Sequence, residues 1–153
     1  MPIVKWTYTM KCLQLVCILG TSIFTATGRV TIPGTANIRF PTVQLNEGGD
    51  YNVSTGVFTC RIPGQYWLSS TLTKVSSSYV DRVYCHVMIN DIGMIQMYTE
   101  PITDQTAAYS MSASAGFHLR LGDRVWVGDC LYPDHIYNTI GTFFSGILIK
   151  PDV

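Results

Sequence analysis

The sequence predicts an all-β fold, a two-sheet antiparallel sandwich or jelly roll, and three observations support this. Glycine or proline recurs at short intervals after Gly28, and the runs between are short and rich in Val, Ile, Tyr, Phe, Trp and Thr. No segment of about 11 residues has the periodicity of an amphipathic helix. Short strands with turns about every 8–12 residues are typical of sandwiches and jelly rolls.

The composition indicates a single domain that buries part of its surface against other chains. The chain has 153 residues, of which 47% are hydrophobic and only 13% are charged. So little charge favours an oligomer with substantial interfaces. Ten Lys and Arg residues balance ten Asp and Glu residues. A nucleic-acid partner is therefore not expected, because the basic excess that binds phosphates is missing.

The amino-terminal 20 residues have the character of a leader, followed by a globular domain at 21–153. The stretch Cys12–Gly28 carries no charge and follows Lys5 and Lys11, as in a secretory signal peptide, with Ala26-Thr27-Gly28 as a small-residue cleavage site. The alternative is an irregular amino terminus, since Ile23–Thr27 is also a candidate opening strand.

The middle of the chain contains two plainly alternating runs, Arg82–Ile89 and Asp123–Val127. Alternation of apolar and polar residues predicts half-buried strands. Asn90-Asp91 lies directly after the first run and predicts a tight hairpin turn.

Between residues 40 and 66, aromatics, an asparagine and a glycine stand at fixed intervals. These positions are Phe40, Asn46, Tyr51, Phe58, Gly64 and Tyr66. Their types and spacing resemble the signature of the complement C1q globular-head family, of the tumour-necrosis-factor-like superfamily. The next two signature positions, usually aromatic, are Leu68 and Ser70, which makes the inner face of this strand less aromatic than usual.

The resemblance continues to both ends of the domain. Leu119–Val127 is similar to the family's Gly-Asp and tryptophan strand pair, Phe144–Ile149 to its closing strand, and Ile23–Thr27 to its opening strand. It implies a C1q/tumour-necrosis-factor-like jelly roll and a homotrimer, with the strands of Tyr66 and Phe144 in the sheet that faces the axis. No Gly-X-Y repeat is present, so we expect no collagen stalk. The residues expected in the core or at the trimer contact are Phe40, Tyr51, Phe58, Gly64, Tyr66, Trp126, Phe144 and Gly146.

The chain has five cysteines, Cys12, Cys17, Cys60, Cys85 and Cys130, so at least one is unpaired. The resemblance places the strands of the last three in one sheet. It implies a Cys85–Cys130 disulfide, with Cys60 buried and free, and a bridge would fit an oxidising compartment.

Neither an enzyme active site nor a cofactor site is predicted. None of the three histidines, His86, His118 and His135, stands in a nucleophile motif. The acidic residues Glu100, Asp104, Asp129 and Asp134 are either solvated loop charges or part of a calcium site of the kind found in some members of the family.

The loop Tyr132–Asn138 is the candidate ligand-binding segment. Asp134, His135, Tyr137 and Asn138 combine carboxylate, amide and ring, which suits sugar recognition. The same residues are also ordinary turn formers. We expect them to be solvent-exposed near one end of the trimer. Asn52-Val53-Ser54 is an N-glycosylation sequon.

These observations predict a secreted, extracellular, non-enzymatic recognition protein. Its trimer would bind glycans or microbial and cell surfaces by avidity, in the lectin-like, innate-immune pattern-recognition role that the resemblance implies. The alternative is a cytokine-like ligand that engages a cell-surface receptor at the grooves between subunits.

Overall fold

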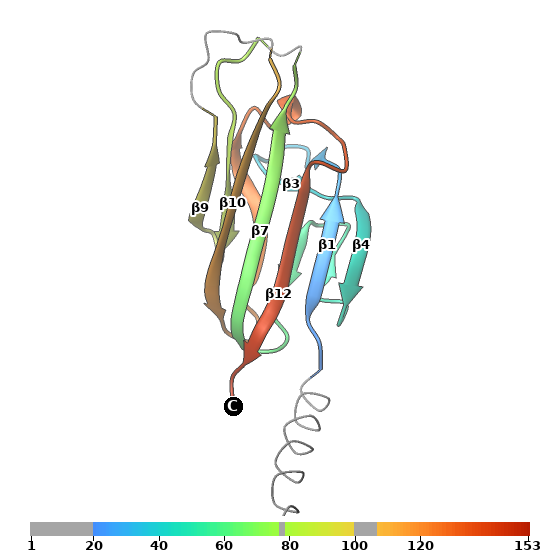
Figure 1. Cartoon of the computed structure of the whole chain (residues 1–153), viewed down its shortest axis with the longest axis vertical. Coiled ribbons are helices and arrows are strands. Elements are labelled where there is room, and N and C mark those ends of the chain that lie inside the picture. Colours follow the sequence, from blue (N-terminus) through green and yellow to red (C-terminus); the bar gives the residue numbers. More distant parts are fainter. Residues whose placement is uncertain (1–19, 77–78, 100–106) are drawn as a thin grey trace, which may run out of the picture.

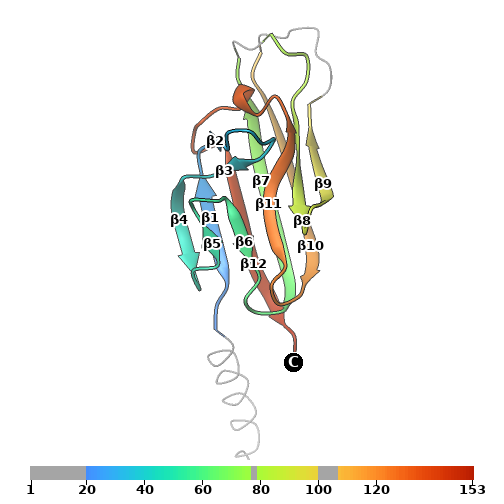
Figure 2. The same cartoon turned by 180° about the vertical axis from the view of Figure 1, so that it is seen from behind.

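The computed structural model describes residues 20–76, 79–99 and 107–153, which form two packed antiparallel sheets (Figures 1 and 2). The five-stranded sheet has the order β10 (Tyr109–Leu119), β7 (Gly64–Lys74), β12 (Phe143–Pro151), β1 (Ile23–Thr27) and β4 (Thr42–Glu47). The predicted all-β jelly-roll sandwich is confirmed. Among the described residues the helical structure is one short 3-10 turn, η1 (Pro133–His135), and no helix is long and apolar enough to cross a membrane.

The seven-stranded sheet is built around β11 (Arg124–Leu131). One side of β11 pairs with β3 (Ile38–Arg39) and β6 (Val57–Thr59), and the other side with β8 (Tyr84–Ile89). Beyond these lie β2 (Val30–Thr31), β5 (Tyr51–Asn52) and β9 (Ile92–Tyr98). The predicted Asn90-Asp91 hairpin turn joins β8 to β9, with φ of 49° and 70° at its two residues.

Aromatic rings, in stacked and edge-to-face pairs, fill the space between the sheets. The ring of Phe24 lies 5.1 Å from that of Tyr51, 5.0 Å from Phe58 and 4.9 Å from Phe144, measured between centroids. Gly146 leaves room for them, because a Cβ there would lie 2.5 Å from Phe24 Cε1. Aromatic pairs at these distances add to the free energy gained by burial.

The residues that the family signature marks are buried within a single subunit. All eight expected core or trimer positions are buried: Phe40, Tyr51, Phe58, Gly64, Tyr66, Trp126, Phe144 and Gly146. They belong to the core of a single chain. Leu68 and Ser70 also face inward and are fully buried, and Ser70 Oγ donates to the carbonyl of Phe143 at 2.8 Å.

The first strand belongs to the fold and is not part of a leader. β1 lies between β12 and β4, and its Phe24 and Ala26 side chains are fully buried. Cleavage at Ala26-Thr27-Gly28 would remove this interior strand, so that cleavage site is incompatible with the fold. Residues 1–19, with Cys12 and Cys17, lie outside the described residues, and the leader at 1–20 stays a prediction.

A network of polar groups holds the segment that enters β1. Ser22 Oγ donates to Asp50 Oδ2 at 2.7 Å, and Arg61 Nε donates to Asp50 Oδ1 at 2.9 Å. Arg61 Nη2 also donates to the carbonyl of Thr21 at 3.2 Å. These contacts tie the segment at Thr21 and Ser22 to the sandwich, and the domain boundary at residue 21 stays a prediction.

The two ends of the sandwich differ. The start of β1 and the carboxyl terminus lie together at one end, which we call the basal end (Figure 1). η1 lies at the opposite end, the apical end (Figure 1).

Cys85 and Cys130 form a disulfide bond between β8 and β11, the pair that the resemblance implies. Their Cα atoms are 4.1 Å apart, well inside the separation of about 7 Å beyond which a bridge cannot form. Cys60 is a buried free thiol, as expected. Burial raises the pKa of this thiol, which keeps it protonated and unreactive.

Candidate functional site

The apical loop 132–138 is held in place by Arg29. The Arg29 guanidinium donates to Asp134 Oδ1 at 3.2 Å and to the carbonyl of Ile136 at 3.0 Å, and its backbone N–H donates to Asn138 Oδ1 at 2.8 Å. Thr31 Oγ1 donates to the same oxygen of Asp134 at 2.6 Å. The carboxylate and amide proposed for sugar recognition therefore already bind groups of their own chain.

The other two residues of the loop are packed more closely. Tyr137 shares a 2.6 Å hydrogen bond with Ser76 Oγ, and this contact lowers the pKa of the Tyr137 phenol. Asp134 and Asn138 are exposed as expected. The expectation of exposure is wrong for His135 and Tyr137, which are half-buried because the loop folds back onto the end of β7. The geometry favours the turn-forming role of these residues.

The acidic residues do not gather into a metal site among the described residues. Asp129 lies 3.1 Å from His86 Nδ1, and Asp134 pairs with Arg29. No group of three or more His, Cys, Asp or Glu side chains converges in the described ranges 20–76, 79–99 and 107–153. Glu100 and Asp104 lie outside these ranges, so a calcium site that includes them stays a prediction.

Two of the three histidines contact carboxylates. His118 Nε2, on β10, lies 3.0 Å from both carboxylate oxygens of Asp152, and His86, on β8, contacts Asp129. Among the described residues no serine or cysteine hydrogen-bonds to either imidazole. A nucleophile and its base must be within hydrogen-bonding reach, so neither pair forms a nucleophilic catalytic site.

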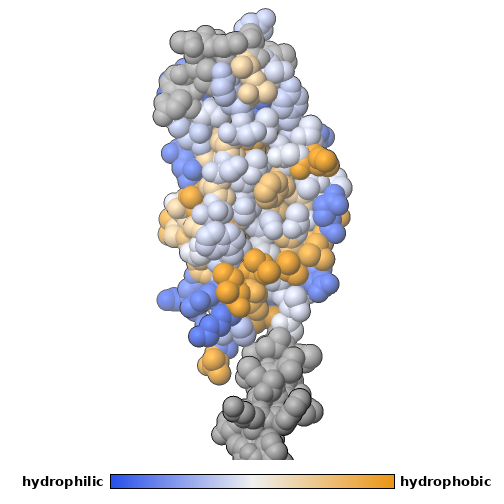
Figure 3. Space-filling view, in the orientation of Figure 1, coloured by the Kyte–Doolittle hydropathy of each residue, from blue (hydrophilic) through white to orange (hydrophobic). Residues whose placement is uncertain are grey.

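The outward face of the five-stranded sheet carries a row of exposed apolar side chains near the basal end (Figure 3). Trp67 on β7 stands opposite Ile147 on β12, and Ile147 stands opposite Ile23 on β1. The side chains of Trp67, Ile147 and Ile149 are 45%, 42% and 59% exposed. We call Ile23, Trp67, Ile147 and Ile149 the apolar belt. None of the four is a signature position, so the motif could not reveal them.

A hollow of about 360 Å³ opens beside the belt. It is lined by Trp67 and Ile149 together with Gly116 and His118. Gly116 lies directly opposite Trp67 on β10, and its missing side chain leaves the face of the indole open. The belt is thus not flat, and a protruding apolar group would fit against it.

The apical half of the same face is lined by hydroxyl groups. Thr71 and Ser112 are 2.8 Å apart, Thr73 and Ser110 are 2.9 Å apart, and Thr25 and Ser145 are 3.0 Å apart, between neighbouring strands. These small side chains allow close approach of another surface without a charge to desolvate.

The glycosylation sequon lies on the other sheet. Asn52 is exposed in β5, and its Oδ1 accepts from the backbone N–H of Ser54 at 2.9 Å. A glycan at this position would not project from the five-stranded face.

Comparison with known proteins shows the family. The C1q domain family matches residues 23–149. Over 136 residues the chain is 31% identical to one of the complement C1q subcomponent polypeptides of Mus musculus, covering 86% of this chain and 51% of the relative. It is 31% identical over 130 residues to complement C1q tumor necrosis factor-related protein 5 of Homo sapiens, covering 81% and 50%. The chain spans about half the length of these relatives.

Solved structures share the fold. The globular domain of zebrafish complement 1qA protein superposes with a TM-score of 0.64 at 17% identity, covering 86% of this chain and 99% of that one. The structure of Eiger TNF from S. frugiperda superposes with a TM-score of 0.65 at 14% identity, covering 88% and 96%. These likenesses concern the architecture alone.

Proposed function

The chain belongs to the C1q domain family, whose domains are non-enzymatic, and from that premise we propose that it is a secreted recognition protein acting as a homotrimer. Its role is to bind glycans or microbial and cell surfaces by avidity, as a lectin-like pattern-recognition protein. The disulfide supports secretion, because such bonds persist in oxidising compartments. In that setting Asn52 is a glycosylation acceptor.

The outward face of the five-stranded sheet is the observation that supports the proposed trimer. Exposed apolar side chains gathered on one face mark interaction sites. The belt and the hydroxyl-lined half together form most of this surface. Its charged side chains include Glu47 on the edge strand β4, opposite Ile23, Lys150 at the basal end of β12, and Asp152, which contacts His118. Two other copies of this chain fit such a surface, and a closed ring would cover it on every subunit.

A trimer binds a multivalent target with a higher apparent affinity than a single site does. When three identical sites sit on one rigid body, binding of the first raises the effective concentration of the others by linkage. The gain reaches about 10²–10⁴-fold in apparent affinity when the target presents several copies of the ligand.

The test compares the trimer with a monomeric variant on multivalent targets. The purified parent should bind yeast cells, bacterial cells or glycoprotein-coated beads, and binding should rise steeply with the density of glycoprotein on the beads. Ile147→Glu, which places a charge in the belt, should lose this density dependence, whereas Ile92→Glu, in β9 on the other sheet, should keep it.

A parent that binds none of these targets, or a monomer that binds as tightly as the trimer, would contradict the proposal. Binding confined to receptor-bearing animal cells would favour the cytokine-like alternative.

A further inference from the structure

The outer face of the seven-stranded sheet stays open to solvent when subunits associate through the other sheet. Near the apical half of this face, two rows of side chains cross the β8–β9 pair. Tyr84 stands opposite Tyr98, and His86 stands opposite Gln96. Paired residues lie about 5 Å apart across strands, and rows two residues apart lie about 7 Å apart along them. The four side chains therefore frame an area the size of one sugar ring.

A β-bulge brings a carboxylate to the edge of this frame. The register of β11 against β8 shifts between Gly128 and Leu131, and Asp129 in the bulge has a left-handed φ of 49°. Bulges re-aim side chains, and here the shift turns the Asp129 carboxylate toward His86. Asp129 Oδ2 lies 3.1 Å from His86 Nδ1, although the contact is not aligned as a hydrogen bond.

Neighbouring groups support the bulge from the side. The amide oxygen of Asn37 accepts the backbone N–H of Asp129 at 3.4 Å. Gly128 permits this approach, because a side chain there would occupy the place of the Asn37 amide. The His86 ring meets the ring of Tyr84 edge to face, with 5.8 Å between centroids.

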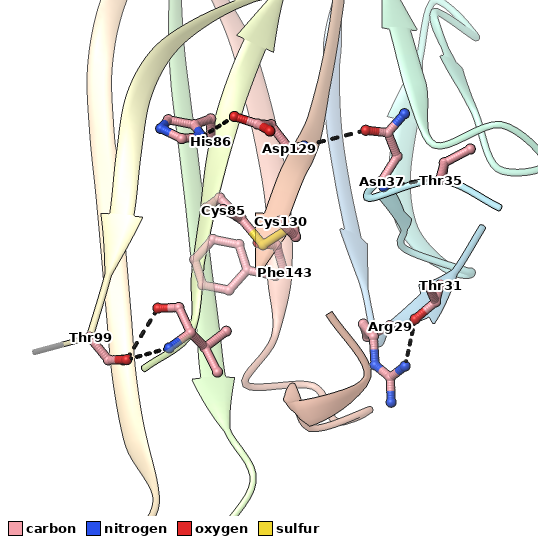
Figure 4. The surroundings of a disulfide bond; sticks show 12 residues. Arg29, Thr31, Thr35, Asn37, Cys85, His86, Thr99, Asp129, Cys130 and Phe143 are labelled. Atoms are coloured by element: carbon pink, nitrogen blue, oxygen red, sulfur yellow. Dashed lines mark hydrogen bonds and ion pairs between the residues drawn. A yellow bond between two sulfur atoms is a disulfide. The ribbon is translucent and has the colours of Figure 1, made fainter. Parts of the chain in front are cut away.

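The disulfide links β8 and β11 next to His86 and Asp129 (Figure 4). Cys85 precedes His86 in β8, and Cys130 follows Asp129 in β11, so the covalent bond joins the two strands next to the point where the His86 and Asp129 side chains meet. Both cysteines are buried while Asp129 is 66% exposed. The disulfide therefore restricts the backbone that carries His86 and Asp129, and this restriction lowers the conformational entropy that these residues lose on binding a ligand.

We infer that Asp129, His86 and Tyr84, framed by Gln96 and Tyr98, form a binding site for a neutral sugar residue, one on each copy of the chain. This inference rests on the proposed function and names where its ligand is held. The Asp129 carboxylate accepts hydrogen bonds from a pair of hydroxyls, the Gln96 amide bonds a third, and the tyrosine rings contact the apolar face of the sugar.

The site is better suited to this task than the apical loop. In the loop, the Asp134 carboxylate accepts bonds from both Arg29 and Thr31. Within the described part of the chain, the Asp129 carboxylate contacts the half-buried ring of His86 and is 66% exposed, so its oxygens remain open to a ligand. A neutral ligand is favoured over a cationic one because the frame holds a single carboxylate beside an imidazole and a neutral amide.

The experiment uses the full secreted trimer and sensor surfaces coated with mannose, galactose, glucose or N-acetylglucosamine. Asp129→Asn keeps a residue that tolerates the left-handed backbone but removes the charge, and Tyr84→Leu removes a ring. Each variant should weaken binding about tenfold or more. Asp129→Asn weakens it because hydrogen bonds to charged groups contribute about 1.5–3 kcal/mol. Tyr84→Leu weakens it because the ring no longer contacts the apolar face of the sugar. The matched control Asp134→Asn, which changes the exposed carboxylate of the apical loop, should bind as the parent does. EDTA should have no effect.

Each other result has a definite meaning. Parental binding by Asp129→Asn, or loss in Asp134→Asn alone, overturns the inference and leaves the proposed function standing. Loss of binding in EDTA overturns a metal-free site. A parent that binds a polylysine surface but no sugar shows a cationic partner, which also overturns the inference. A parent that binds microbial cells but none of the four sugars also overturns the inference. The proposed function fails when the parent binds no multivalent target or when the monomeric variant binds as tightly as the trimer.

Discussion

At the residue scale, the space around each glycine determines which substitutions the sandwich tolerates. Gly146 and Gly116 both lie in strands of the five-stranded sheet, but on opposite faces. A Cβ at position 146 would meet Phe24 and Leu68 in the core, at 2.5 and 3.1 Å. A Cβ at position 116 would come no closer than 3.7 Å to the Trp67 ring.

We therefore expect Gly146→Ala to destabilise the protein by about 1–3 kcal/mol, the usual cost of overpacking a core. Gly116→Ala should change thermal stability little. Thermal unfolding of both variants at one protein concentration tests this, because assembly also affects the midpoint. Equal midpoints for Gly146→Ala and the parent would show that the Phe24 ring moves aside without loss.

The apical loop supplies a second prediction at this scale. Tyr137→Phe removes the hydrogen bond to Ser76 and should lower the denaturant midpoint of unfolding by the small amount expected for one lost hydrogen bond. Tyr132→Phe is the matched control in the same loop, since Tyr132 is 47% exposed. Denaturant unfolding of the two variants should separate them. If both behave as the parent does, the loop is not held through its phenol.

At the element scale, the turn at Asn90 and the turn at 120–124 are joined by hydrogen bonds. The Asp123 carboxylate accepts the backbone N–H of Arg120 at 2.7 Å and the side-chain amide of Asn90 at 2.8 Å. Asn90 in turn accepts the backbone N–H of Arg124 at 2.9 Å. The bond from the Arg120 backbone has the largest effect and lowers the pKa of Asp123 in the folded state; burial opposes it, and the bond from Asn90 lowers the pKa further.

A depressed carboxyl pKa in the folded state stabilises the protein above the unfolded pKa, about 3.9. The contribution is lost as the pH falls through the lower, folded value. Asp123→Asn should therefore be less stable than the parent at pH 7 and equally stable in strong acid. Melting temperatures measured from pH 7 to pH 2 give this comparison. A difference that persists unchanged at the acid end would assign it to lost geometry and not to charge.

The sequence predicted the elements well where a local pattern determines them. The strands within Arg82–Ile89 and Asp123–Val127 and the Asn90-Asp91 turn are found where alternation and turn chemistry placed them, and the opening strand at Ile23–Thr27 is found where the family resemblance placed it. The bulge at Asp129 had no such signal, because it depends on the register of β11 against β8. Lys74 is another example: it is fully buried, with Nζ donating to the carbonyls of Val75 and Ala107, although lysine usually indicates an exposed position.

At the scale of the whole molecule, the signature motif predicted the fold but not the functional surfaces. Its residues, such as Phe58 and Tyr66, are buried, so their spacing reports on packing between the two sheets. The belt residue Ile147 and the outer-face residue Asp129 lie on exposed surfaces, and the spacing of the signature residues does not report on such surfaces. The candidate loop was found by composition, and only the structure showed that Arg29 already binds its carboxylate.

Assembly is the property on which the other proposals depend. In a closed trimer the three belts meet, and burying each large aliphatic side chain contributes about 1.5–3 kcal/mol. Ile147→Glu would place three like charges at the meeting point, where each loses water without gaining a partner. We therefore expect this variant to sediment as a folded monomer at micromolar concentration, while the parent and Ile92→Glu sediment as trimers. Ile92 is a fair control because it is 63% exposed and lies in the edge strand β9 of the other sheet. A monomeric parent would remove the basis for avidity, and a trimeric Ile147→Glu would place the contact between copies on another face of the sandwich.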